Sequence, residues 1–353
     1  MTTQTLTPDA PVLGYWSGVR SVFALEMKQR LRSRSWYVLL VVWFVVIGLV
    51  ATLTALSSSA MAGPQGPVLY ELMVGFILFF GLLLAPALSA NAVNGDRAAG
   101  TLAILQVTLL RPGQIMAGKW LASWLASMGF LVASIPFLLW ALALGGVQPL
   151  SAVVALVMLA VELGIVCAVG VGVSALAARP LFSIVVTYML VAMLGLGTLI
   201  AFGLSGFLTE ETVKVNSSTY SYTADGTEEF TCSGPLMDVQ VAHTERIAWI
   251  LAANPFVVVA DSIPVTSESD ENGFTSSGVM EGISTTVRAA QAGPEYTMPC
   301  LNGESRQGSQ PDVPPIWPLG LTIQAALAAL LVFLGRRRLR TPVRNLAAGT
   351  RIA

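Results

Sequence analysis

The chain has 353 residues, of which 54% are hydrophobic and 11% are charged. This low charge and a mean hydropathy of +0.71 exclude an ordinary soluble domain, so the sequence predicts an integral membrane protein. The formal net charge is −1, and we expect no nucleic-acid partner.

Residues 1–35 are predicted to be a cytoplasmic segment that precedes the first apolar run. Within it, residues 14–35 fit an amphipathic helix on the inner leaflet, held by apolar burial and by attraction to anionic headgroups. The apolar stripe is Trp16, Val19, Phe23, Met27 and Leu31, and the basic residues are Arg20, Lys28, Arg30, Arg32 and Arg34. The simpler alternative is a basic flank of the first span.

Six apolar runs are each long enough to cross a bilayer, which needs about 20 helical residues. They cover residues 36–56, 68–90, 120–144, 151–177, 181–208 and 316–334. The first five, within 36–208, are joined mostly by short loops and should form a compact antiparallel set. The predicted fold class is an all-α polytopic membrane protein. It has six transmembrane helices, an N-terminal interfacial amphipathic helix and a small extracellular domain between helices five and six.

A charged segment at about 96–112 separates spans two and three. Asp96 and Arg97 form its polar entry, and Gly100-Thr101 should begin a short helix that Pro112 ends. Leu102, Leu105 and Leu109 would then lie on one side of this helix at helical spacing. We interpret it as an element that a soluble partner pushes. The alternative is that these leucines rest on the inner leaflet.

Residues 113–119 match the first seven positions of a phosphate-binding loop, but Trp120 stands where Ser or Thr should hold magnesium. A membrane span follows directly, so we expect no ATP site here and no enzyme activity in this chain. Lys119 is instead expected at the level of the inner headgroups, and Gly118 should permit close helix packing.

Residues 209–315 form a polar insert with fifteen acidic and four basic residues. Cys232 and Cys300 are expected to form a disulfide, with two free thiols as the alternative. Residues 215–223 have the pattern of a strand, and 267–282 that of a loop. The apolar stretch 247–260, broken at Asn254-Pro255, would either dip into the membrane face and cap the bundle or form the core of the insert.

Charge asymmetry orients the chain. Fifteen Lys and Arg residues fall on the predicted inner side and four on the outer side, which places both termini in the cytoplasm and 209–315 outside. Span six at 316–335 then leads into a basic cytoplasmic tail, 336–353. The excess of Arg over Lys, sixteen to three, suggests a GC-rich bacterial genome, and we expect the chain in the plasma membrane.

Few side chains within the spans are polar enough to carry chemistry. Glu162 lies near the middle of span four and should face the bundle, either on a substrate path or as a protonated acid bonded to a neighbouring helix. Glu71 is expected to reach water. The single histidine, His243, offers no metal or hydrolytic site. Glycines 195, 197, 203 and 206 should loosen the outer half of span five.

The ordered layout resembles the permease subunit of type-2 ABC exporters, which have the type V fold. The matching residues are the helix at 16–31, the Asp96–Leu105 segment, Gly118-Lys119 before span three and Asn254-Pro255-Phe256 before the last span. The resemblance implies a permease that exports a drug, peptide or lipid. Separate ATPase subunits would carry ATP and magnesium, and a second permease would complete a homodimer or heterodimer. The alternatives are a secondary transporter and a membrane sensor or scaffold with an extracellular ligand-binding domain.

Overall fold

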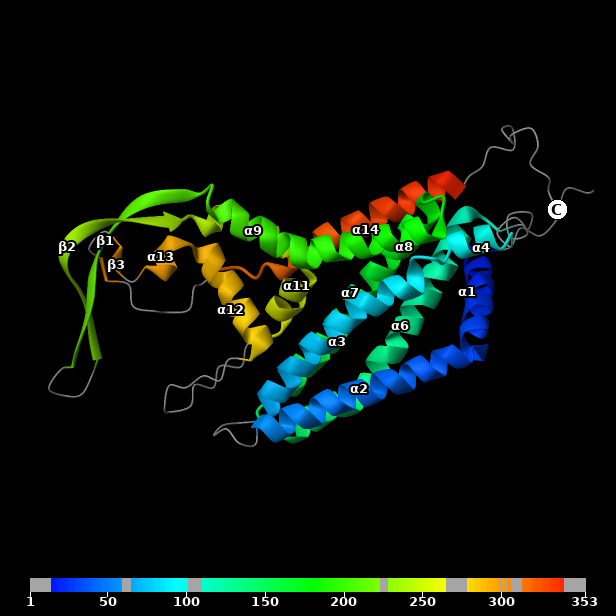
Figure 1. Ribbon diagram of the computed structural model, residues 1–353, viewed down its shortest axis with the longest axis horizontal. Coiled ribbons are helices and arrows are strands. Elements are labelled where there is room, and N and C mark those ends of the chain that lie inside the picture. Colours follow the sequence, from blue (N-terminus) through cyan, green and yellow to red (C-terminus); the bar gives the residue numbers. More distant parts are fainter. Residues whose placement is uncertain are drawn as a thin grey trace, which may run out of the picture.

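The computed structural model describes residues 14–58, 65–100, 110–222, 228–264, 278–298, 300–301, 304–305 and 313–339. In this part of the chain six helical spans are long and apolar enough to cross a membrane, as predicted (Figure 1). They are α2 (Arg34–Ser58), α3 (Gln65–Ser89), α6 (Pro112–Ala143), α7 (Pro149–Leu176), a fifth span, Pro180–Gly206, and α14 (Trp317–Leu339). The chain is thus a mostly helical polytopic membrane protein.

The fifth span consists of three pieces: α8 (Pro180–Ala192), the π-helical η1 (Met193–Gly197) and α9 (Thr198–Gly206). The short helix α4 (Asn94–Ala98) follows α3. Helices α9 and α4 lie at opposite ends of the bundle: α9 runs toward the β-strands, whereas α4 lies beside α1 (Figure 1).

Helix α7 lies in the middle of the bundle, where it packs against α3, α6, α8 and α14. Its glycines make this possible. A Cβ on Gly172 would come within 2.8 Å of the Leu331 backbone of α14, and one on Gly164 within 3.1 Å of the Trp124 ring of α6. Helix α2 and the fifth span have mostly exposed apolar side chains, which suits helices that face lipid.

The predicted amphipathic helix is α1 (Tyr15–Arg32), which packs against one end of α6. Its buried residues are Gly18, Val19 and Val22, whereas Trp16 and Leu31 of the predicted stripe are 74% and 48% exposed. The predicted face is therefore only partly right. The small residue Gly18 lets one side of α1 approach Gln114 of α6. A prediction that considers only lipid binding does not anticipate this contact.

Residues 209–315, which we call the ribbon domain, contain a small sheet that the all-α class omits. The long antiparallel strands β1 (Glu210–Tyr222) and β2 (Glu228–Ala242) form a ribbon that extends away from the bundle (Figure 1). Two short strands, β3 (Cys300–Leu301) and β4 (Glu304–Ser305), complete the order β2-β1-β3-β4. The expected disulfide joins Cys232 on β2 to Cys300 on β3.

Helices connect the ribbon to the bundle. They are η2 (Thr244–Arg246), α10 (Trp249–Ala252), α11 (Pro255–Ser262), α12 (Val279–Ala292) and α13 (Pro294–Thr297). The loop predicted at 267–282 is wrong at its end, because α12 begins at Val279. The signal for α12 was present in the sequence: Met280, Ile283, Val287 and Ala290 recur at helical spacing and are buried or half-buried.

The apolar stretch 247–260 serves both of its predicted roles. Val258, Val259 and Ala260 of α11 join the main core of the bundle. Leu251 and Val257 belong instead to a second cluster, which includes residues of α12 and, at its edge, Phe202 of α9 and Ile323 of α14. This stretch therefore caps the bundle and supplies part of the core above it.

Two carboxylates fix this cap in place. Asp261, 3% exposed, accepts hydrogen bonds from Ser284 Oγ, Arg288 Nε and the backbone N–H groups of Ile316 and Trp317. It thereby joins α11 and α12 to the start of α14.

The second carboxylate is Glu71 of α3. It accepts hydrogen bonds from the backbone N–H groups of Met280 and Glu281 at 3.0 and 3.2 Å, so it caps α12. Glu71 stays partly exposed, and its contact with α12 is what sequence reasoning missed.

Candidate functional site

A buried cluster of charges lies where α1, α4 and α6 meet, and we call it the junction. Lys119 of α6 is 1% exposed and forms ion pairs with Glu26 of α1 and, at 2.6 Å, with Asp96 Oδ2 of α4. The expectation that Lys119 lies among headgroups is wrong, because the two carboxylates supply its counter-charge inside the protein. Residues 113–119 are part of helix α6 and do not form a loop.

Two arginines extend the junction to the other spans. Arg97 of α4 donates to the carbonyls of Ala177 and Ala175, at 2.7 and 3.4 Å, at the end of α7. These carbonyls have no partner within the helix, and a cation at a helix C-terminus is favourable. Arg30 of α1 donates to the Leu88 carbonyl of α3 at 2.8 Å. One set of charges thus ties α4 to α1, α6 and α7, and α1 to α3.

Close packing brings these charges together. A Cβ on Gly118 would lie 2.7 Å from the Val22 Cβ of α1, so Gly118 permits the close approach that was predicted for it. Gln114, which sequence reasoning missed, donates to the Tyr15 carbonyl at 3.1 Å and accepts from the Arg111 N–H at 2.7 Å. Nothing in the sequence around Gln114 distinguishes it from a glutamine on the surface, so its burial in the first turn of α6 could not be predicted.

The predicted coupling residues are only partly within the described chain. Asp96 and Arg97, the predicted polar entry, lie in the short helix α4, and both belong to the junction. Gly100 has a φ of +73° and follows α4, so the chain changes direction there. Residues Thr101, Leu102, Leu105 and Leu109 lie outside the described residues, and their role remains a prediction.

Glu162 of α7 is completely buried, as predicted, and neither carboxyl oxygen has a hydrogen-bond partner among the described residues. Gln324 of α14 lies close enough to interact with Glu162 and also donates to the Ala253 carbonyl at 3.2 Å. A buried carboxyl is costly in a membrane, and Gln324 of the neighbouring helix α14 is the polar side chain beside it.

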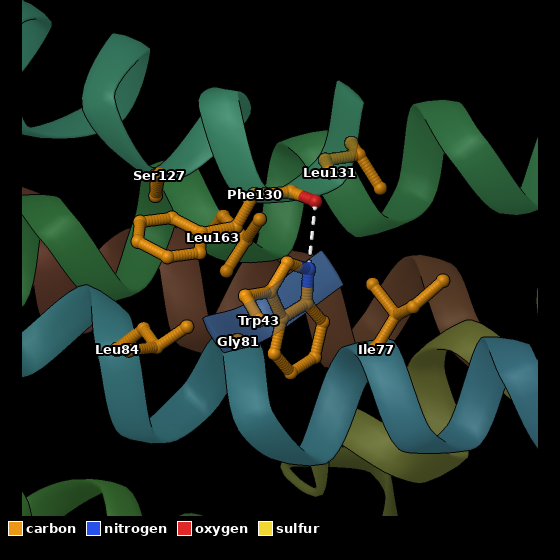
Figure 2. A pocket seen from close by; sticks show the side chains of 8 residues that line it. All are labelled: Trp43, Ile77, Gly81, Leu84, Ser127, Phe130, Leu131 and Leu163. Atoms are coloured by element: carbon orange, nitrogen blue, oxygen red, sulfur yellow. Dashed lines mark hydrogen bonds between the residues drawn. The ribbon is translucent and has the colours of Figure 1, made fainter. Parts of the chain in front are cut away.

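A small cavity lies among α2, α3, α6 and α7 (Figure 2). Its lining includes Trp43, Gly81, Ser127 and Leu163, and the Trp43 indole donates to the Phe130 carbonyl at 3.0 Å. The volume is about 10 Å³, close to that of one water-sized sphere. It is a void in the packing and far too small to hold a transported molecule.

The ribbon domain has a polar group at its base. His243 lies with its Nδ1 2.6 Å from Glu245 Oε1, and Arg246 pairs with Glu211 at 2.6 Å. The hydrogen bond from Arg246 lowers the pKa of the Glu211 carboxyl. Among the residues that the structure describes, no group of three or more His, Cys, Asp or Glu side chains is placed to hold a metal ion.

Six helical spans, with α1 packed across one end and a charged junction among α1, α4 and α6, define a polytopic helical membrane protein. The chain belongs to the ABC-2 family: the family described as "ABC-2 family transporter protein" matches residues 20–334. This match covers five spans and most of α14, and it shows an ABC-type permease, the membrane component of a transporter. No curated protein matches the chain.

Proposed function

We propose that this chain is the membrane-spanning subunit of an ATP-driven exporter and that separate ATPase subunits drive it through the segment after α4. The junction is the observation that supports this proposal. The segment 101–109 leaves α4 directly, and α4 is tied by Lys119 to α1 and α6 and by Arg97 to α7. A push on that segment would therefore reach several spans at once.

The physical basis is a bundle with two alternative packings. Nucleotide-driven closure of the ATPases would displace the segment, and the ion pairs would carry that displacement into α1, α6 and α7. ATP and magnesium would bind to the partner ATPase. A second permease, identical or different, would enclose the path, since the cavity among α2, α3, α6 and α7 is about 10 Å³ and cannot hold a cargo.

The cargo proposed for this path is hydrophobic or amphipathic: a drug, a peptide or a lipid. Glu162 is the residue of the spans that we assign to the path, because its carboxyl is buried without a hydrogen-bond partner among the described residues. A group on the cargo that donates a hydrogen bond or carries positive charge would supply that partner when the helices open.

The proposed orientation places both termini in the cytoplasm and the ribbon domain outside the plasma membrane. The surface residue Thr286 tests it as Thr286→Cys. Cys167 is buried and Cys232 is paired with Cys300, so the new thiol is the one expected to react. An impermeant maleimide should label this variant in whole cells, and labelling only after lysis would reverse the orientation.

Copurification with the ATPase subunit tests the coupling itself. Leu105→Asp should abolish association with the ATPase or transport-linked ATP hydrolysis, because loss of a buried leucine at an interface hot spot typically costs about 2–5 kcal/mol. Val107→Asp is the matched control, since a helix places residue 107 on the side opposite Leu102, Leu105 and Leu109. If Leu105→Asp retains wild-type association and turnover, the coupling role is wrong.

A further inference from the structure

The fifth span changes its helical geometry in the middle. At η1 the Thr198 N–H bonds to the Met193 carbonyl, five residues back, where an α-helix would use a carbonyl four residues back. A π turn of this kind accommodates one extra residue and disturbs the ladder of backbone hydrogen bonds. Gly195 and Gly197 lie within it, where glycines were expected to loosen the span.

A side chain from the ribbon domain occupies this disturbed turn. Asn254 Nδ2 donates to the Gly195 carbonyl at 2.8 Å and to Thr198 Oγ1 at 3.0 Å. The other end of the same side chain, Oδ1, accepts the Phe256 N–H at 2.9 Å and caps α11. Asn254 is 1% exposed, so both of its polar ends are used inside the protein.

The connection between α10 and α11, which carries Asn254, is also held by contacts with helices other than the fifth span. Gln324 of α14 donates to the Ala253 carbonyl, and Gly320 of α14 leaves no room for a Cβ beneath the Ala252 carbonyl. Asp261 and Glu71 fix the rest of the cap. The connection between α10 and α11 is therefore fixed to α14 and to the rest of the cap.

The outer part of the fifth span is anchored far less. Neither η1 nor α9 has a buried residue, and a Cβ on Gly195 or Gly203 would meet nothing within 4 Å. Asn254 thus supplies a buried polar contact to this span, beside the apolar packing of Phe202 of α9 against Leu251 and its neighbours in the cap. Four residues beyond Gly206, the chain enters β1, so any rotation of α9 reaches the ribbon.

We propose that Asn254 is a positioning residue that holds α9 in the π-bulged register, and that its release from Gly195 lets α9 turn as the outer gate of the transporter. If η1 relaxes to an α-helix, α9 shifts by one residue, about 100° of rotation and 1.5 Å of rise. A side chain about 5 Å from the helix axis then moves by roughly 8 Å. The gating role rests on the proposed transport function, whereas the control of register does not.

The discriminating variant is Asn254→Asp. Aspartate keeps a side-chain oxygen that can cap α11, and Asp and Asn are about equally good N-cap residues. It lacks the N–H₂ group that donates to the Gly195 carbonyl. Spin labels at Leu204 on α9 and Leu319 on α14, both exposed, report the position of α9. The distance between them is measured by pulsed electron resonance on the purified full-length chain in nanodiscs, with no ATPase present.

Wild-type protein should give one distance distribution, and Asn254→Asp should give a second population displaced by several ångströms. Deleting Leu196 removes the extra residue of the π turn, so in that background Asn254→Asp should no longer change the distribution. If the Asn254→Asp variant alone does not accumulate as folded protein, the proposal predicts that the Leu196 deletion restores its accumulation.

An unchanged distance in Asn254→Asp would overturn the proposal, whether or not the thermal unfolding midpoint falls. An equal effect of Asn254→Asp with and without Leu196 would overturn it too. Neither result depends on an ATPase subunit, so failure here is distinct from failure of the Leu105→Asp experiment.

Discussion

Replacing Lys119 with methionine should destabilise the protein by removing the ammonium group that pairs with both Glu26 and Asp96. Methionine has a similar length and no charge, so the substitution removes the ion pairs to Glu26 and Asp96 with little change in volume. Breaking a buried ion pair by removing one partner typically costs about 3–5 kcal/mol.

The structure sets where in that range the loss should fall. Glu26 is 12% exposed and cannot be fully hydrated, whereas Asp96, at 27%, keeps some access to water. Arg30 also acts on Glu26 and offsets part of the unpaired charge. We therefore expect about 3 kcal/mol, the lower end of the range for buried pairs.

A double-mutant cycle in detergent measures this loss. Lys119→Met and Glu26→Gln are made singly and together, and the free energy of unfolding is measured for each. Residues in one ion-pair network show interaction energies of about 0.5–3 kcal/mol, so the double variant should be more stable than the sum of the single losses predicts. Strict additivity, or a Lys119→Met protein within about 1 kcal/mol of wild type, would refute the account of the junction as a buried charge cluster.

Three further results are expected. Gly118→Val should separate α1 from α6 and lower the thermal unfolding midpoint, because a Cβ added to Gly118 would lie 2.7 Å from the Val22 Cβ. The control Gly203→Ala should leave the midpoint unchanged, because an added Cβ there would meet nothing within 4 Å. Equal midpoints for the two variants would contradict the contact between α1 and α6. Unreduced peptides should show Cys232 linked to Cys300 by mass spectrometry, and replacing both with serine should cost roughly 4 kcal/mol in the chain-entropy model for a separation of 68 residues. Glu162→Gln should preserve expression and unfolding temperature but reduce cargo-stimulated ATP hydrolysis by the assembled transporter, and wild-type stimulation would remove Glu162 from the path.

The sequence alone determined the membrane class, the six spans and the disulfide partners. Long apolar runs admit few structures in a bilayer, because the backbone must satisfy its own hydrogen bonds and helices do this locally. The disulfide followed from having two cysteines in the same polar insert and a third inside a span. The family resemblance, carried by the order of elements, was confirmed by the match over residues 20–334.

Tertiary structure decided the partners of the polar side chains. Lys119 finds Glu26 and Asp96 from segments 93 and 23 positions away, and Glu71 finds the start of α12 more than 200 residues later. Hydrophobic periodicity is a local property, and it carries no information about which distant carboxylate meets which distant donor. The π turn held by Asn254 is the same case: glycines in span five indicated a weak helix, but only the packing of the cap against that span placed an amide at the Gly195 carbonyl.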